Sequence, residues 1–185
     1  KLLLVKRRGS PGMPQNWVGN CSKRGPFDDE LAVLSPVRPD GKLTTLYKPE
    51  SKLFVGDVDL HWDADRMLIS SQLSNKRYEV FELKADGTGI RQVSKTIDGV
   101  DNYDACYLPN EKIIYDSTSV FQGVPCVGGG SQVANLHIMN RDGTGVRRLC
   151  FDQDHDWYPS VLNDGRIIFT RWEYSDSPHY FTRIV

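Results

Sequence analysis

One turn occurs twice in this chain, as "LKADGTGIRQV" (83–93) and "MNRDGTGVRRL" (139–149), and it decides the fold. In each copy an Asp-Gly pair separates two runs of alternating character, which is typical of a β-hairpin whose glycine adopts a positive φ. A weaker third copy, "VLSPVRPDGKLTTLY" (33–47), has Asp40 and Gly41 at the same place. The sequence therefore predicts three hairpins of one kind, spread over most of the chain.

A second family of segments lies between these hairpins, and each member reads as strand, turn, strand. Laid out without gaps, the segments are "DVDLHWDADRMLISS" from Asp57, "YDACYLPNEKIIYDS" from Tyr103 and "WYPSVLNDGRIIFTR" from Trp157. The segments begin 46 and 54 residues apart. A repeat of about this length that contains four strands is typical of a β-propeller blade. We therefore predict an all-β fold, a β-propeller of four-stranded antiparallel blades.

About three and a half blades fit into the chain, which we expect to be a single partial propeller domain over 1–185. Complete blades are predicted at 57–93 and 103–150. A blade lacking its first strand is predicted at 1–50, and an incomplete one at 157–185. Because both ends of the chain fall within repeats, we expect it to be a section of a longer polypeptide.

Composition and charge narrow the choice of partner. The chain has 39% apolar and 25% charged residues and a formal charge of −1, so it lacks the basic field that attracts nucleic acid or an anionic membrane. No apolar run approaches the roughly 18–20 residues of a membrane span, and the sequence contains no signal peptide. We therefore predict neither nucleic acid nor membrane as a partner.

The four cysteines form no CxxC or CxxCH pattern, so the sequence has neither a zinc-ribbon nor a covalent haem motif. Their even number permits two disulfides, and free structural thiols are the alternative. Cys106 and Cys150 lie in strand patterns, where cysteine usually packs as a small buried side chain. A transition-metal site of Cys126 with His155, or with Cys21 or His137, is conceivable because thiolate and imidazole bind such ions.

Several stretches carry a resemblance to known families. The segments 139–149 and 159–169 resemble the TolB-like and WD-like propellers. A longer set of segments is similar to the propeller that forms the middle domain of the hydrazine synthase alpha subunit and of many related large bacterial proteins. It covers "LLLVKRR" (2–8), "GDVDLHWDADRMLISS" (56–71), "VDNYDACYLPNEKIIYDST" (100–118), "FQGVPCVGGG" (121–130) and "RRLCFDQDHDWYPSVLNDGRIIFTRWEYSD" (147–176).

This resemblance implies a six-bladed parent propeller within a longer, exported, periplasmic protein, in which c-type haem could occur only in neighbouring domains. The chain departs from the family pattern at Ser119, where relatives often have a cysteine ahead of Cys126, and this weakens a paired-thiol interpretation. Because a fold can host many activities, the resemblance implies oxidoreductase chemistry of the hydrazine synthase alpha type only if other segments supply it.

Long, irregular loops are predicted to gather on one face of the propeller, because strands alternate in direction within each blade. Loops of this kind on a rigid scaffold commonly carry function. They include an acidic group that could offer oxygen ligands to calcium. Its members are Asp98, Asp101, Asp104, Asp152, Asp154, His155 and Asp156. The alternative is that these side chains cap turns and loop amides.

Aromatic side chains complete the set of candidates. Trp17 and Trp157 are predicted to face a partner, although Trp62 and Trp157 also adjoin inner strands, where packing between blades is the commoner role. His61 and His137 lie in strand patterns and are expected to be hydrogen-bonded core or channel residues.

No nucleophile elbow, zinc-protease motif or phosphate loop is present, so no catalytic residue is predicted and catalysis by this chain alone is disfavoured. The first hypothesis is a non-catalytic scaffold whose loop-rich face docks the rest of its own polypeptide, another subunit or a ligand. The alternatives are a component of a multidomain haem or metal redox enzyme and a carbohydrate-binding propeller. No cofactor is predicted in the chain itself beyond the calcium or transition-metal sites above.

Overall fold

A computed structural model describes residues 1–7, 27–125, 128–174 and 182–185. The regular elements of these residues are β-strands in four antiparallel sheets, numbered here sheets 1 to 4 in chain order. Within the described residues no helix has the length and apolar character needed to cross a bilayer.

Each sheet is a meander in which the strands pair in chain order. Sheet 1 contains β1 (Leu2–Lys6), β2 (Glu30–Ser35) and β3 (Lys42–Tyr47). Sheet 2 contains β4 (Val55–Leu60), β5 (Arg66–Gln72), β6 (Tyr78–Lys84) and β7 (Arg91–Gln92). Sheet 3 contains β8 (Asn102–Tyr107), β9 (Ile113–Ser117), β10 (Asn135–Met139) and β11 (Arg147–Arg148). Sheet 4 contains β12 (Asp156–Val161), β13 (Ile167–Trp172) and β14 (Thr182–Ile184).

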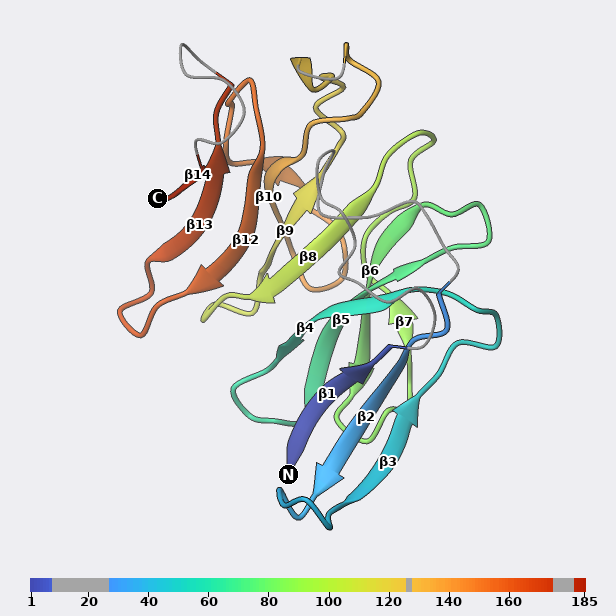
Figure 1. Cartoon of the computed structure of the whole chain (residues 1–185). Helices are drawn as coiled ribbons and strands as arrows, with labels where there is room; N and C mark the ends of the chain where they lie inside the picture. Colours follow the sequence, from blue (N-terminus) through green and yellow to red (C-terminus); the bar gives the residue numbers. More distant parts are fainter. Residues whose placement is uncertain (8–26, 126–127, 175–181) are drawn as a thin grey trace.

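Successive sheets follow one another face to face around the molecule, as blades of a propeller do (Figure 1). Two four-stranded sheets lie between two three-stranded ones. The predicted all-β propeller of about three and a half blades is therefore confirmed.

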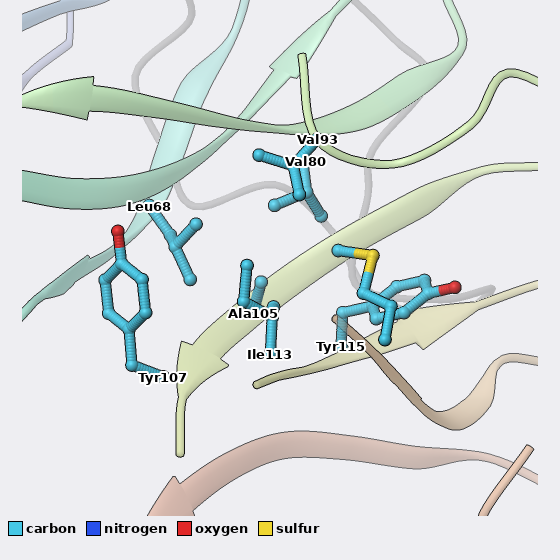
Figure 2. Close-up of a cluster of buried hydrophobic side chains, with 8 residues drawn as sticks. Leu68, Val80, Val93, Ala105, Tyr107, Ile113 and Tyr115 are labelled. Carbon is cyan, nitrogen blue, oxygen red and sulfur yellow. The ribbon is translucent and has the colours of Figure 1, made fainter. Parts of the chain in front are cut away.

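The core is divided into separate clusters between neighbouring sheets. Between sheets 2 and 3, Leu68 and Val80 pack against Ala105, Tyr107 and Ile113, and all five are buried (Figure 2). Burying one such Val, Leu or Ile side chain contributes roughly 1.5–3 kcal/mol, so each sheet depends on its neighbour for much of its stability. Similar clusters join sheet 1 to sheet 2 and sheet 3 to sheet 4.

A buried carboxylate adds a polar link between sheets 2 and 3. Glu82 in β6, 4% exposed, accepts a hydrogen bond from the Tyr107 hydroxyl at 3.0 Å and one from Arg141 Nε at 2.8 Å. Arg91 of its own sheet donates from Nη2 at 2.6 Å. Burial alone would raise the pKa of Glu82, but the bonds from Arg141, Arg91 and Tyr107 outweigh it and hold the pKa below its ordinary value. Glu82 is therefore ionised at neutral pH.

The two closely matching Asp-Gly hairpins form the turns predicted from sequence, whereas Gly41 of the weaker third copy does not have a positive φ. Gly87 and Gly143 have φ values of 86° and 83°, in the region that favours glycine. In the second copy, Asp142 accepts hydrogen bonds from both the backbone N–H and the hydroxyl of Thr144. Asp86 does the same for Thr88.

The same glycines also touch the preceding sheet. A Cβ on Gly87 would lie 2.1 Å from the carbonyl oxygen of Leu46 in β3, and one on Gly143 would lie 2.2 Å from that of Val93 after β7. Only glycine allows the two backbones to approach so closely. The turn therefore recurs because each hairpin must both reverse the chain and seat against the neighbouring blade.

The innermost strand of sheets 2, 3 and 4 carries a β-bulge at a residue with positive φ, namely Asp57, Asp104 and Tyr158. These three residues correspond in the structure, so the gap-free alignment that pairs Asp57 with Tyr103 and Trp157 is wrong by one position.

The reason for this shift lies in the turn between the first two strands of each blade. In sheet 2 the N–H of His61 bonds to the carbonyl of Arg66, five residues on, whereas in sheet 3 Leu108 bonds to Lys112, four residues on. The turn of sheet 2 therefore has one additional residue, which displaces β4 in any alignment without gaps.

Replacing Gly143 with Ala should destabilise the protein more than replacing Gly165, which has a φ of 85° and open space where a Cβ would lie. Gly165→Ala introduces only the left-handed strain, about 1–2 kcal/mol. Gly143→Ala adds the clash with Val93, a further ~1–3 kcal/mol. Urea unfolding of both variants measures the difference, and equal losses would show that the contact with Val93 does not constrain the hairpin.

Candidate functional site

The long loops emerge at one end of the sheets, which we call the loop face. In the described residues this face includes the connections at 93–101, 118–125, 128–134 and 149–155. The opposite end, which we call the turn face, has the Asp-Gly hairpins and the short turns at 61–65, 108–112 and 162–166.

Three of the acidic candidates, Asp98, Asp101 and Asp104, are not gathered in one place. Asp98 is exposed in its loop, whereas Asp101 is 2% exposed and accepts hydrogen bonds from the Tyr78 N–H at 3.1 Å and from Arg77 at 3.0 Å. Asp104 lies within β8, where its carboxylate accepts the N–H of Tyr158 at 3.0 Å. Asp101 and Asp104 therefore join neighbouring strands through backbone amides.

The other acidic candidates, Asp152, Asp154 and Asp156, converge in part. Asp152 and Asp156 come together with Cys150, so that one ligand atom of each lies within 4.8 Å of the others. Arg171 donates to Asp152 Oδ2 at 2.5 Å and to Asp156 Oδ1 at 2.9 Å. Asp154 is separate, since its Oδ2 accepts the Tyr174 N–H at 2.7 Å.

Arg171 supplies a positive charge between the two carboxylates of this cluster. Burial, with the charge of Asp152, raises the pKa of Asp156 to about 6 although the bond from Arg171 opposes the shift. Burial and the charges of Asp156 and Asp152 raise the pKa of the Cys150 thiol to about 12. Cys150 is therefore a neutral thiol at physiological pH, and a metal ion here would compete with Arg171.

Neither Cys150 nor Arg171 was among the sequence candidates. Arg171 could have been found by counting back from the turn at 162–166, because β12 and β13 pair with Asp156 opposite Arg171. Cys150 could not, because the loop between β11 and β12 has no period that indicates which side chains turn toward one another.

His155 and Trp157 are part of the core at this end of the molecule. The His155 ring is 1% exposed, accepts the Ala134 N–H at Nδ1 over 3.0 Å, and stacks on Trp157 with ring centres 4.3 Å apart. Burial lowers the pKa of His155 to about 3, so the ring is neutral. The sequence predicts a partner-facing Trp157, but the structure buries it to 9% exposure because it packs with Val124, Val133 and Trp172.

The remaining thiol and aromatic candidates, Cys21, Cys126 and Trp17, lie outside the described residues. His137 is 5% exposed, with its two ring nitrogens 3.2 Å from the Ser119 hydroxyl and 3.0 Å from the Asn135 carbonyl oxygen. It is a hydrogen-bonded core residue, as expected.

Large apolar side chains are exposed on the loop face. Phe121 is 70% exposed in the loop after β9, and Phe151 is 76% exposed in the loop after β11. Arg148 joins the two loops, because its guanidinium lies 4.9 Å from the centre of the Phe151 ring and donates to Gln122 at 3.4 Å. We call Phe121, Gln122, Arg148 and Phe151 the aromatic patch.

A depression of about 440 Å³ lies on the turn face, where the first turns of sheets 2, 3 and 4 meet. Its lining comprises His61, Trp62, Asp63, Pro109, Glu111, Val161, Leu162, Asn163 and Gly165. Sequence favours core packing for Trp62, but the side chain is 58% exposed because it lies in the turn and not in the strand before it.

Polar contacts hold one wall of this depression. His61 is 4% exposed, with its Nε2 3.2 Å from Glu111 and 2.6 Å from Arg66. Arg66 donates to Glu111 at 2.6 Å and to Asp65 at 3.0 Å. His61, Asp63 and Asp65 are close enough to bind one metal ion together. Arg66 already neutralises part of their charge through its bond to Asp65.

The fold and these two faces are those of a partial β-propeller. The chain matches no protein-family model and no curated protein. Its similarity is to solved structures, and at the identities observed it concerns the fold alone.

Three of these structures illustrate the relationship. The putative TolB of Agrobacterium tumefaciens matches with a TM-score of 0.62 and 15% identity over 85% of this chain and 52% of that protein. TolB of Acinetobacter baumannii matches with a TM-score of 0.61 and 16% identity, over 85% of this chain and 34% of that one. Hydrazine synthase of Kuenenia stuttgartiensis matches with a TM-score of 0.63 and 10% identity, over 91% of this chain and 27% of that one. The chain therefore shares the propeller fold of the two families that its sequence resembles, and it spans about half the length of the first structure.

Replacing Asp156 with Asn should change how stability depends on pH. The pKa of Asp156 is about 6 in the folded protein and 3.8 without the fold, so the folded state binds the proton more tightly. The stability contributed by Asp156 is then complete below pH 4 and is lost as pH rises toward 6. Because Asn does not ionise, the Asp156→Asn variant does not lose stability in this way as pH rises.

The melting temperature of Asp156→Asn minus that of the wild type should therefore increase between pH 4 and pH 7. Asp98→Asn, at an exposed position, serves as the control and should show a constant difference. A constant difference for Asp156→Asn would contradict the raised pKa.

Proposed function

We propose that this chain is part of a non-catalytic propeller scaffold in a larger exported protein, and that its loop face docks a partner domain or subunit. The observation that carries the proposal is the aromatic patch, in which Phe121 and Phe151 are exposed on adjacent loops of a rigid framework. The exported, periplasmic location rests on the resemblance to TolB-like propellers.

The chemistry of the patch suits a protein partner. Single exposed apolar residues are common, but aromatic residues and arginine are enriched at protein–protein interfaces. Here Arg148 lies over the Phe151 ring and bonds to Gln122, the residue after Phe121. Arg148 is positioned by its bonds to Gln122 and to the Cys150 carbonyl, so little side-chain entropy would be lost when a partner covers it.

The architecture supports the same proposal. Sheets 1 and 4 have three strands each, and the solved relatives contain more chain than this one covers. A partial propeller of this kind belongs to a larger assembly. The partner is then the rest of the same polypeptide or another protein subunit.

A role within a haem or metal redox enzyme rests on the fold similarity to hydrazine synthase alone. In that case the loop face would supply walls to a site built by a neighbouring domain, and any c-type haem would be bound there. No contact among the described residues favours this alternative over docking.

A photocrosslinking amino acid at Phe121 should form covalent links to another domain or subunit of the native-length protein, because this position is expected to be covered. The matched control is Val146, which is 51% exposed in a hairpin of the turn face. Peptide mapping by mass spectrometry identifies the linked segment. Equal yields at the two positions, or no link at Phe121 beyond its own loop, would overturn the docking proposal.

Carbohydrate binding is a second candidate, and the exposed Trp62 favours it. An indole face beside carboxylate and amide groups can stack on a sugar ring while Asp63 and Asn163 accept or donate hydrogen bonds to its hydroxyls. This site would lie on the turn face and would be independent of the aromatic patch.

Titration with cellohexaose, chitohexaose or maltohexaose should then quench tryptophan fluorescence in the wild type. Trp62→Ala should abolish the change, while Trp157→Phe should retain it because Trp157 is buried. Quenching that persists in Trp62→Ala, or its absence with all three sugars, would rule out this candidate.

A further inference from the structure

Asp116 in β9 is a buried carboxylate in an unusual position. The residue is 0% exposed, and neither carboxyl oxygen has a hydrogen bond of good geometry to another group of the described structure. Burying a charged group without a compensating partner costs several kcal/mol, so proteins rarely retain one without a reason.

Comparison with the neighbouring blade shows which part of this arrangement the fold requires. Asp116 pairs with Tyr103 across sheet 3 as Ser70 pairs with Gly56 across sheet 2, so Asp116 and Ser70 occupy the same place. The Ser70 hydroxyl accepts the N–H of Asp104, the bulge residue of the next blade, at 2.9 Å. The Asp57 carboxyl also bonds to this N–H and to Ser70, so one carboxyl together with a neutral hydroxyl is sufficient to join one bulge to the next.

At the junction of sheets 3 and 4 this link is supplied by carboxylates. The bulge N–H there belongs to Tyr158, and Asp104 Oδ2 accepts it at 3.0 Å. The same N–H is the one favourable contribution to the ionised form of Asp116. One amide thus faces two carboxylates, and the junction has an excess of negative charge that the fold does not require.

Electrostatics at Asp116 is correspondingly unfavourable to the anion. Burial first, and then the charges of Asp104, Asp57 and Asp156, raise the pKa of Asp116 well above its ordinary value. No lysine or arginine of the described residues bonds to Asp116, and Arg171 is engaged by Asp156 and Asp152. The carboxyl must therefore be protonated or neutralised by a cation from solution.

We propose that Asp116 and Asp104 bind a calcium ion between the inner strands of sheets 3 and 4. Hard carboxylate oxygens are preferred ligands of calcium, and its flexible coordination allows backbone carbonyls to complete the shell. Magnesium fits less well, because it retains several waters and Asp116 has no exposed surface to admit them.

Softer metals are disfavoured by the nearest thiol. Cys106 is 6% exposed and packs in the apolar cluster with Leu108, Ile114 and Leu136, so its sulfur is part of the core. Zinc and copper prefer thiolate or imidazole, whereas calcium needs only the oxygen ligands present. This site is distinct from the proposed docking face and does not depend on that proposal.

The test uses the native-length protein, stripped of divalent ions with a chelator and then dialysed against calcium chloride. Elemental analysis after desalting should give one more calcium ion per chain for the wild type than for Asp116→Asn, and calcium should raise the melting temperature only where the ion binds. Asp104→Asn should weaken binding at least tenfold. Asp98→Asn, at an exposed acid of the loop face, should bind like the wild type.

The alternative of a protonated Asp116 gives a different result. Asn closely matches a neutral carboxyl in shape, so Asp116→Asn would then leave both calcium content and melting temperature unchanged, and the proposal would be overturned. It would also be overturned if magnesium chloride at the same concentration raised the wild-type melting temperature as much as calcium does. If Asp116→Asn does not fold, Asp104→Asn against Asp98→Asn provides the same comparison.

Discussion

Close packing of each sheet against the next is the constraint on which the rest of the structure depends. The sheets are too thin to bury an apolar face alone, so the core exists only between neighbours. Backbone contact at Gly87 and Gly143 and the bonds around Glu82 hold the sheets at a fixed separation. The loops at either end are thereby presented on a rigid frame, and they can vary without altering the fold.

Much of the fold could be read from the sequence because its determinants are local. Asp-Gly pairs at a constant place in the repeat specify the hairpins. The apolar runs that follow Arg66, Lys112 and Arg166 specify the second strands. The gap-free alignment was wrong for the inner strands because the length of the turn after them does not show in the local sequence pattern. A single additional residue in the turn after β4 leaves the strands on both sides unchanged in character, and only the hydrogen bond from His61 to Arg66 shows it.

The candidate sites were less predictable, because side-chain direction depends on tertiary context. Trp62 and Trp157 both adjoin inner strands, yet one is exposed in a turn and the other lies beneath the loops. Asp101 and Asp154 look like ligands in sequence and accept backbone amides in the structure. Which carboxylates meet one another depends on the bulges and on which neighbouring amide each side chain reaches.

A repeating architecture makes functional departures visible, because each blade is a control for the next. Ser70, Asp116 and Thr170 occupy one position in three successive second strands, and only the middle one has an ionisable side chain. The bulge amide of the next blade requires an acceptor, which Ser70 provides without an unfavourable charge. A carboxylate at this position therefore exceeds what the scaffold needs. The same comparison separates a residue that maintains the propeller from one that gives a single blade a property of its own.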